Sequence, residues 1–438
     1  MANQKISKIF FYIFVFLLPW QTRLILFPEK PEFLGFSIYL SEIFLWLALT
    51  FWLASIGFKK IKPPFVFMFL CFYVLVSIFW SPDKIAAFRI WLYIFEGMMV
   101  YLYLKNYKKE NPPQPSFFKG GSIPLCKRGI EGDFILIFLF SLFIASVFGI
   151  FQFFNLGSPA WKWLGLAERG AWNLGDIVVQ LNGARFLRAY GPFPHPNIFG
   201  GYLAAGILLL FRIFPERSKA ACPAKLLVIQ ERSGESRGYN KNFVLRLAQG
   251  IKFLFGGVFF LALFLTFSRS AWLALAAAST YFIFKNLRKD VLKFFVFLSA
   301  LAIAFYIIFL PLVKMRIIAE GRLEQKSNTE RVASWKEGFA AWRQNPFFGS
   351  GPGNYNVGLA KPYSQPAHNI FILVLAELGI AGFVIYLFLW RGFWKNPVLR
   401  PFLILFFVIG LFDHYLWTLY SGSMLFWFGL SLFSNENS

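Results

Sequence analysis

Long apolar stretches separated by shorter polar ones dominate the pattern of this chain. A membrane-spanning helix needs about 20 mostly apolar residues, and this rule predicts about 12 spans along the sequence. They cover roughly residues 9–27, 36–57, 64–80, 90–104, 134–154, 192–212, 253–268, 270–285, 293–312, 368–390, 398–412 and 417–434. The pattern therefore predicts an all-α, polytopic integral membrane protein.

Composition and charge agree with this class. Of the 438 residues, 58% are hydrophobic and 15% are charged, whereas soluble domains carry about 25% charged residues. The formal net charge of +23 would suit a nucleic-acid binder, but no water-soluble surface could hide so many apolar side chains. We therefore expect membrane lipids, and no nucleic acid, among the partners of this protein.

The basic residues predict the orientation, because cytoplasmic loops of membrane proteins carry an excess of Lys and Arg. One set of alternate loops, together with both termini, holds 27 of the 44 Lys and Arg residues. We predict that this set is cytoplasmic. It includes two polar stretches, 105–133 and 213–252, which we interpret as flexible loops without a chemical role. The membrane segments 1–312 and 368–438 then flank an outer-face loop at 313–367.

The outer-face loop contains a pattern typical of an amphipathic helix. Ser327 and Glu330 have the spacing of a capping box, which marks a helix start. Asn345-Pro346 would end the helix. The apolar stripe between these signals consists of Val332, Trp335, Phe339 and Trp342. The spacing predicts a helix over 328–344 that lies along the outer membrane surface.

Two arginines on the predicted outer face could bind an anion. Arg331 falls in the first turn of the predicted helix, where free N–H groups and a guanidinium together suit a phosphate. Pairing with a nearby Glu is an equal alternative for this residue. Arg269 interrupts two apolar runs. An arginine at membrane depth usually faces a cavity or a partner, although its side chain could also extend to the outer interface.

All three histidines lie on the predicted outer face. His195 and His368 open the sixth and tenth spans, and His414 closes the eleventh. Three histidines on one side indicate a polar cavity that opens outward. Glu377 follows His368 by nine residues and would lie on the opposite face of a straight helix. We therefore expect Glu377 to serve interhelical packing beside Gly379 rather than to pair with His368.

Three segments in one order resemble a known family. They are Thr-Phe-Ser-Arg269-Ser-Ala-Trp, then Glu330-Arg331 with the later Asn-Pro-Phe-Phe-Gly-Ser-Gly-Pro-Gly-Asn-Tyr355, and then His368-Asn369 with Glu377-Leu-Gly-Ile-Ala-Gly382. This ordered set resembles the O-antigen ligase and O-antigen polymerase family of bacterial envelope glycosyltransferases. The elements His195-Pro-Asn197 and Asp413-His414-Tyr415 are also similar to members of this family.

The resemblance implies transfer of a glycan from undecaprenyl pyrophosphate on the outer face of the bacterial inner membrane, with no metal and no other cofactor. The acceptor would be lipid A-core for a ligase, or another lipid-linked glycan for a polymerase. Carried over by motif, His368 would be the catalytic base, and Arg269 and Arg331 would bind the pyrophosphate. The possible accessory residues are His195, Asn197, Asn369, Glu377, Asp413 and His414.

Two alternative functions remain open from the sequence. A lipid-linked glycan transporter or flippase would also have many spans, but it predicts charges near the midplane and symmetric halves. In this chain the two halves are unlike and the polar residues concentrate at the outer ends. A protein O-oligosaccharyltransferase would use the same donor. The sequence does not distinguish a ligase from a polymerase, because the two differ in an acceptor surface that it does not reveal.

Overall fold

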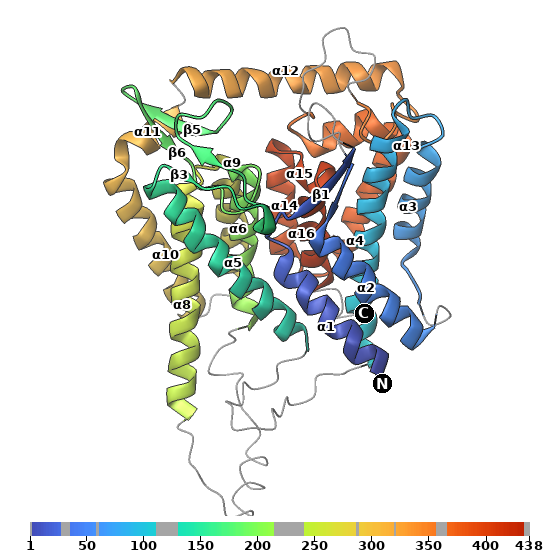
Figure 1. Ribbon diagram of the computed structural model, residues 1–438, viewed down its shortest axis with the longest axis horizontal. Helices are drawn as coiled ribbons and strands as arrows, with labels where there is room; N and C mark the ends of the chain where they lie inside the picture. Colours follow the sequence, from blue (N-terminus) through green and yellow to red (C-terminus); the bar gives the residue numbers. More distant parts are fainter. Residues whose placement is uncertain are drawn as a thin grey trace, which may run out of the picture.

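The computed structural model describes residues 2–27, 36–57, 61–110, 130–213, 241–285, 289–318, 321–355 and 366–432. The protein is mainly helical, as predicted (Figure 1). The helices are α1 (Ala2–Leu17), α2 (Leu40–Ile56), α3 (Phe65–Ser77), α4 (Lys84–Glu110), α5 (Ile130–Phe154), η2 (Lys162–Leu164), α6 (Pro196–Ile213), α8 (Lys241–Leu265), α9 (Arg269–Lys285), α10 (Lys289–Ile308), α11 (Leu310–Ile318), α12 (Arg322–Gln344), α13 (Ile370–Trp394), α14 (Arg400–Phe412), α15 (Tyr415–Thr418) and α16 (Tyr420–Ser431).

Five of the described segments are long and apolar enough to cross a membrane. They are Lys84–Asn106, Gly132–Phe154, Arg246–Leu265, Val291–Ile308 and Ile370–Trp394. Shorter apolar helices cover Leu40–Ile56, Phe65–Ser77, Pro196–Phe211 and Arg400–Phe412. These helices indicate a membrane protein, whereas the number of about 12 spans stays a prediction.

The structure also contains short strands that the all-α prediction did not include. Within the described residues they form three antiparallel pairs: β1 (Arg23–Phe27) with β2 (Phe36–Tyr39), β3 (Gly157–Ser158) with β4 (Arg169–Gly170), and β5 (Val178–Leu181) with β6 (Ala184–Leu187). In the first pair Arg23 lies opposite Tyr39, and in the last Val178 lies opposite Leu187.

The first strand pair corrects the predicted spans 9–27 and 36–57. Helix α1 ends at Leu17, residues 23–27 are a strand, and α2 begins only at Leu40. Pro19 gives the physical reason, because the residue before a proline disfavours helical geometry and the proline itself lacks the N–H that would continue the helix. An apolar run alone does not report such a break.

The two predicted cytoplasmic loops are partly helical. Helix α4 continues to Glu110 and α5 begins at Ile130, so both ends of 105–133 belong to helices. Helix α8 begins at Lys241, inside the predicted loop 213–252. The remaining residues of these loops, 111–129 and 214–240, lie outside the described part of the chain. The division between the seventh and eighth spans is confirmed, because α8 ends at Leu265 and α9 begins at Arg269.

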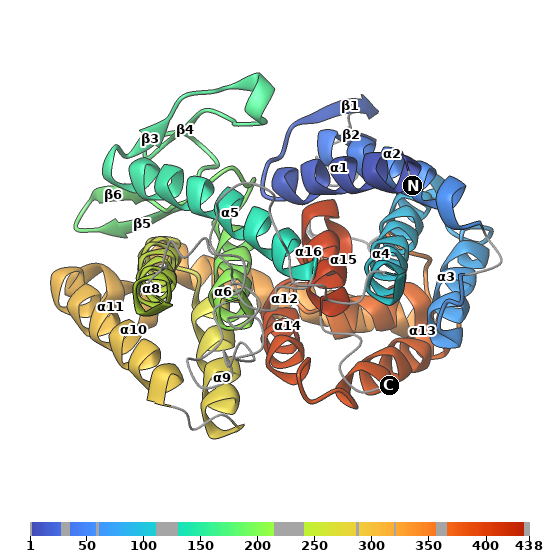
Figure 2. The same ribbon diagram turned by 90° about the horizontal axis from the view of Figure 1, so that it is seen from below.

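The helices pack around a central group of α6, α14, α15 and α16 (Figure 2). Every residue of α16 is buried. Long-range packing joins α1 with α2, α4 with α16, and α9 with α14. The core between the helices is strongly aromatic: Phe138, for example, contacts both Tyr202 and Phe428. This packing brings the starts of α6, α9 and α13 and the end of α14 to the same end of the bundle.

Helix α12 runs crosswise over that end of the bundle (Figure 1). It packs on α13 through small residues, and a Cβ added at Gly338 would lie 2.6 Å from Ile372 Cγ2. Ser334, Gly338 and Ala341 are buried, whereas Val332 and Phe339 are 49% and 43% exposed. The predicted apolar stripe is therefore divided: Val332 and Phe339 are exposed, whereas Trp335 contacts His368 and Trp342 packs against the core.

Helix α12 begins at Arg322, not at residue 328 as predicted. The cap is Gly321, whose backbone is extended, and the Ser327 to Glu330 signal lies inside the helix. The physical reason is that a capping box contributes only about 1 kcal/mol, while Glu324 in the added turn makes a buried ion pair with Arg316. The predicted end is confirmed, since Asn345 follows the last helical residue.

Helix α13 is broken at Gly379, and the glycine-rich loop (residues 346–355) fills the break. Gly379 has φ +65° and ψ −171°. The carbonyls of Ala376 and Glu377 accept from the N–H groups of Ser350 and Gly351, at 3.0 and 2.8 Å. On the other side of the break, the Ile380 N–H donates to the Pro346 carbonyl at 2.9 Å. The loop therefore satisfies the backbone groups that the break leaves without helical partners.

Candidate active site

His368 lies just before α13 and faces the end of α14. Its Nδ1 is 3.6 Å from Asp413 Oδ1. Its backbone is fixed by α12, because its N–H donates to Ser334 Oγ at 3.3 Å and its carbonyl accepts from Trp335 Nε1 at 3.2 Å. Three elements thus position one imidazole next to one carboxylate.

Asp413 is the point where the predicted polar residues meet. Its Oδ2 accepts from Asn197 Nδ2 at 2.9 Å and from Ser270 Oγ at 3.3 Å. Burial raises the pKa of Asp413, but the hydrogen bond and charge of His368 and the charge of Arg331 outweigh burial and hold the pKa below its usual range. The carboxylate is therefore ionised at neutral pH and can orient an imidazole through its N–H.

The other two histidines belong to the same group. The rings of His368 and His414 are 5.2 Å apart, in an edge-to-face arrangement. His414 Nδ1 lies 2.7 Å from Thr418 Oγ1, and His195 Nδ1 accepts from the Asn197 N–H at 3.0 Å. Burial lowers the pKa of His195 and of His414 to about 3, so both are neutral at neutral pH. We define His195, Asn197, Ser270, His368, Asp413 and His414 as the histidine cluster.

A second group, the arginine cluster, is formed by Arg188, Arg269, Arg316 and Arg331. Arg188 connects it to the histidine cluster, because its Nη2 donates to Asn197 Oδ1 at 2.8 Å and its Nε donates to the Thr266 carbonyl at 2.5 Å. Burial, together with the charge of Arg316, lowers the pKa of Arg188. A guanidinium nevertheless keeps its proton in proteins, so positive charge is concentrated beside the histidines.

Arg269 and Arg316 are held by backbone carbonyls and by α12. Arg269 Nη2 donates to Asn328 Oδ1 at 2.7 Å, and its Nη1 lies 3.5 Å from the Arg316 carbonyl. Arg316 donates through Nε to the Phe267 carbonyl at 2.9 Å and through Nη1 to Glu324. Arg269 therefore points toward α12 and the other cations, which fits a fixed positive charge better than an isolated side chain reaching for the interface.

Arg331 lies on α12, but not in the first turn of that helix as predicted. Because α12 begins at Arg322, Arg331 lies in the interior of the helix, where the N–H groups are used within the helix. The proposed help from a helix N-terminus is therefore wrong for this residue. Among the described residues, its guanidinium has no hydrogen-bond or ion-pair partner, and its charge acts on Asp413.

Asn369 and Glu377 have structural partners. Asn369 is the N-cap of α13: its side chain accepts from the N–H groups of Phe371 and Ile372. Glu377 Oε2 accepts from Trp417 Nε1 at 2.8 Å, next to the break in α13. The expectation that Glu377 serves packing therefore agrees with its surroundings, although α13 is not straight and His368 lies before it.

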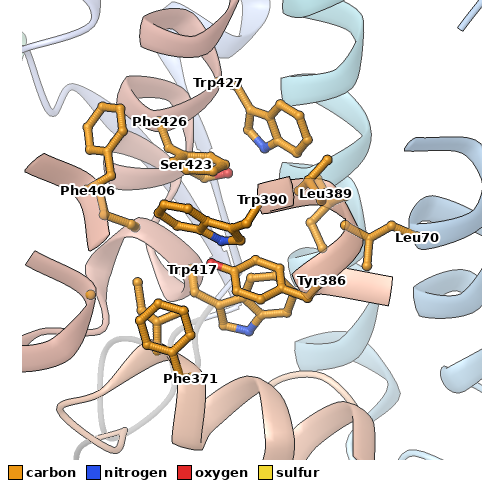
Figure 3. A pocket seen from close by; sticks show the side chains of 14 residues that line it. Leu70, Phe371, Tyr386, Leu389, Trp390, Phe406, Trp417, Ser423, Phe426 and Trp427 are labelled. Carbon is orange, nitrogen blue, oxygen red and sulfur yellow. The ribbon is translucent and has the colours of Figure 1, made fainter. Parts of the chain in front are cut away.

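An aromatic layer inside the bundle joins α13, α14 and α16 (Figure 3). It surrounds a cavity of about 20 Å³, which is room for about one water molecule. Ile370 and Gly410 adjoin the histidine cluster along the chain, and Tyr386, Trp390 and Trp417 line the cavity. The cavity is too small to hold a sugar-sized ligand.

Sequence reasoning missed part of the arginine cluster. Arg316 and Glu324 were not singled out, and Ser270 was noted only as a neighbour of Arg269. The buried ion pair of Arg316 and Glu324 joins α11 to the first turn of α12. A contact between two consecutive helices leaves no periodic pattern in the sequence. A search for ionisable residues close to predicted helix ends could have found it.

Metal ligands are a separate question. Within the part of the chain that the structure describes, no group of three or more His, Cys, Asp or Glu side chains could hold a metal ion. The expected independence from metal stays a prediction. A reaction at this site would use the charges of arginine and the basicity of histidine, both of which the described residues provide.

Comparison with known proteins gives one family. Residues 254–387 match the family model described as O-antigen ligase, and no curated protein matches the chain. The matched segment contains Arg269, Arg331 and His368, together with the newly identified Arg316 and Glu324. It covers the break in α13 and the glycine-rich loop as well. The resemblance drawn from the sequence is therefore confirmed for this segment, and residues 254–387 form a domain of the O-antigen ligase family.

Proposed function

We propose that this protein transfers a glycan from undecaprenyl pyrophosphate to an acceptor hydroxyl on the outer face of the bacterial inner membrane, with both termini in the cytoplasm. The observation that carries the proposal is the meeting of the His368–Asp413 pair with the arginine cluster at one end of the bundle. One group supplies a base and the other supplies positive charge. The reaction of a sugar pyrophosphate with a hydroxyl needs both.

In this mechanism His368 takes the proton of the acceptor hydroxyl. Its Nδ1 faces Asp413, so an ionised Asp413 favours the form that carries the proton on Nδ1 and leaves Nε2 as the base. The hydroxyl oxygen then forms a bond to the anomeric carbon, while its proton moves to Nε2. Asp413 is a positioning residue, because it acts through the imidazole.

The bond between the anomeric carbon and the pyrophosphate oxygen breaks in the same step, and its electron pair leaves with the pyrophosphate. Arg269 and Arg331 stabilise this growing negative charge, which requires no proton and no metal. A single displacement of this kind inverts the anomeric configuration. The acceptor is lipid A-core if the protein is a ligase, and a lipid-linked glycan if it is a polymerase.

The test is a transfer assay with full-length protein reconstituted in liposomes. His368→Ala and Arg269→Ala should each reduce transfer at least about 100-fold, with unchanged protein in the membrane. Lys336→Ala is the matched control, because its exposed side chain lies on α12 outside both clusters, and it should retain full activity. Full activity of either cluster variant would contradict the mechanism. Movement of labelled donor across the membrane without an acceptor would instead favour a flippase.

A deletion strain would separate the two acceptors. Loss of a ligase should leave long glycan chains on the lipid carrier, whereas loss of a polymerase should leave single repeats. Glycan that disappears from a protein rather than from a lipid would identify a protein O-oligosaccharyltransferase. Each outcome keeps the same donor and changes only the acceptor.

A further inference from the structure

Glu324 is a buried carboxylate between two members of the arginine cluster. It lies in the first turn of α12, and its side chain is only 7% exposed. Its Oε2 accepts from Arg316 Nη1 and is 3.9 Å from Arg269 Nη2. One carboxylate oxygen therefore occupies the space between two guanidinium groups that belong to α11 and α9.

The arginines around Glu324 have few negatively charged partners. Arg188 and Arg269 are both close enough to be affected by Arg316, Arg331 and Glu324. The other acceptors of Arg188 and Arg269 are neutral, namely carbonyls and the amides of Asn197 and Asn328. Glu324 thus supplies the anion that the cluster needs when no ligand is bound, because buried charges of one sign repel each other.

A carboxylate and a phosphate use the same donors. Both accept paired hydrogen bonds from a guanidinium, so a pyrophosphate oxygen and Glu324 would compete for Arg316 and Arg269. The carboxylate is attached to the first turn of a helix. It cannot leave the cations unless that turn moves.

We propose that Glu324 is an internal substitute for the pyrophosphate of the donor: it holds the arginines until the donor arrives and is then displaced, so that the first turn of α12 moves away from α11. This inference rests on the proposed function and adds a residue that sets donor affinity. Glu324 is not a catalytic residue, because the donor and Glu324 occupy the site in turn.

The experiment measures binding of undecaprenyl pyrophosphate to the full-length protein in nanodiscs, with undecaprenol as the probe that lacks phosphate. Glu324→Gln keeps the size of the side chain and removes the competing charge. It should bind undecaprenyl pyrophosphate about tenfold more tightly than the wild type, with no change for undecaprenol. Glu330→Gln is the matched control, because the side chain of Glu330 on α12 is 43% exposed and pairs with Lys326, and this variant should bind like the wild type.

Weaker or unchanged binding by Glu324→Gln would overturn the inference, because a residue that only supports Arg316 should weaken the site when it is lost. If the wild type binds undecaprenyl pyrophosphate and Arg269→Ala does not, the proposed function stands whatever Glu324→Gln does. If the wild type binds both probes equally, the proposed donor site and this inference fail together.

A second measurement uses the wild type alone and does not depend on the folding of a variant. Hydrogen exchange of the backbone amides at 321–327 should become faster when undecaprenyl pyrophosphate is bound, because the turn loses its contact with Arg316. The amides of 331–342, which pack on α13, serve as the internal control and should not become faster. Slower or unchanged exchange at 321–327 would overturn the inference.

Discussion

The histidine cluster and the arginine cluster lie side by side but are built in different ways. Asp413 is fixed by short side chains at helix ends, such as Asn197 and Ser270. The arginines instead connect α9, α11 and α12 through long side chains, and the carboxylate of Glu324 pairs with both Arg316 and Arg269. The first arrangement suits a base that must keep its direction, and the second suits a site that must accept and release a charged group.

Among the substitutions that compare the two clusters here, Asp413→Asn has the largest expected effect. Loss of the charge removes the group that orients the His368 imidazole, so kcat should fall about 100-fold while the KM for the donor changes little. The pH profile of kcat should shift as well, and Asp413→Glu should recover part of the rate. Asp176→Asn is the control, since it removes a buried carboxylate that pairs with Arg169, at 2.7 Å, outside both clusters. A pure change in KM would place Asp413 in donor binding instead.

Arg331→Ala tests the arginine cluster. In the proposed mechanism Arg331 binds the pyrophosphate and stabilises its growing charge, so we expect the KM for the donor to rise about tenfold and kcat to fall as well. Arg331→Lys should recover only part of the affinity. The control is Arg343→Ala, which removes an exposed arginine from the last turn of the same helix. An unchanged donor KM, measured by initial rates, would remove Arg331 from the binding site.

Two substitutions with smaller expected effects compare the histidine cluster with the arginine cluster directly. Ser270→Ala removes a donor from a buried carboxylate and should lower kcat about fivefold. Asn328→Ala removes an acceptor from Arg269, which keeps the Arg316 carbonyl and Glu324 nearby, and should change kcat or KM no more than about twofold. Equal effects of the two substitutions, with equal protein in the membrane, would show that the clusters do not differ in rigidity.

The smallest expected effect concerns acid stability. The pKa values of His195 and His414 are about 3 in the folded protein, below the ordinary value of about 6.5. The unfolded chain therefore takes up protons first, and stability should fall as the pH drops from about 6.5 toward 3. Thermal unfolding in detergent should show a lower midpoint at pH 5 than at pH 7.5, and His414→Asn should reduce that difference. An undiminished difference would contradict the burial of a neutral His414.

The sequence predicted what depends on local runs of residues. Apolar runs located most helices, because burial in lipid requires them, and the separation of α8 from α9 at Arg269 followed from a three-residue interruption. The three histidines were placed on one side by counting spans, and the structure brings His195, His368 and His414 into one cluster. These predictions need only the order of elements along the chain.

What the sequence did not predict depends on contacts between distant elements. The start of α12 was placed too late because the capping box at Ser327 is a local signal, whereas Glu324 is held by Arg316 from another helix. Asn197 was proposed only as an accessory residue, yet it bridges Arg188 and Asp413. Such hydrogen bonds form where the ends of different helices come together in the fold. No repeat or motif in a single sequence shows which helix ends will do so.

The break in α13 also constrains how the protein can be made. In the described part of the chain, two carbonyls and two N–H groups around Gly379 are paired with the glycine-rich loop, and each such group left bare in lipid costs several kcal/mol. The loop comes just before α13 in the chain, so the ribosome delivers it first. During synthesis the loop can therefore be in place when α13 leaves the translocation channel, and a circular permutation that reversed this order would send an incomplete helix into the bilayer.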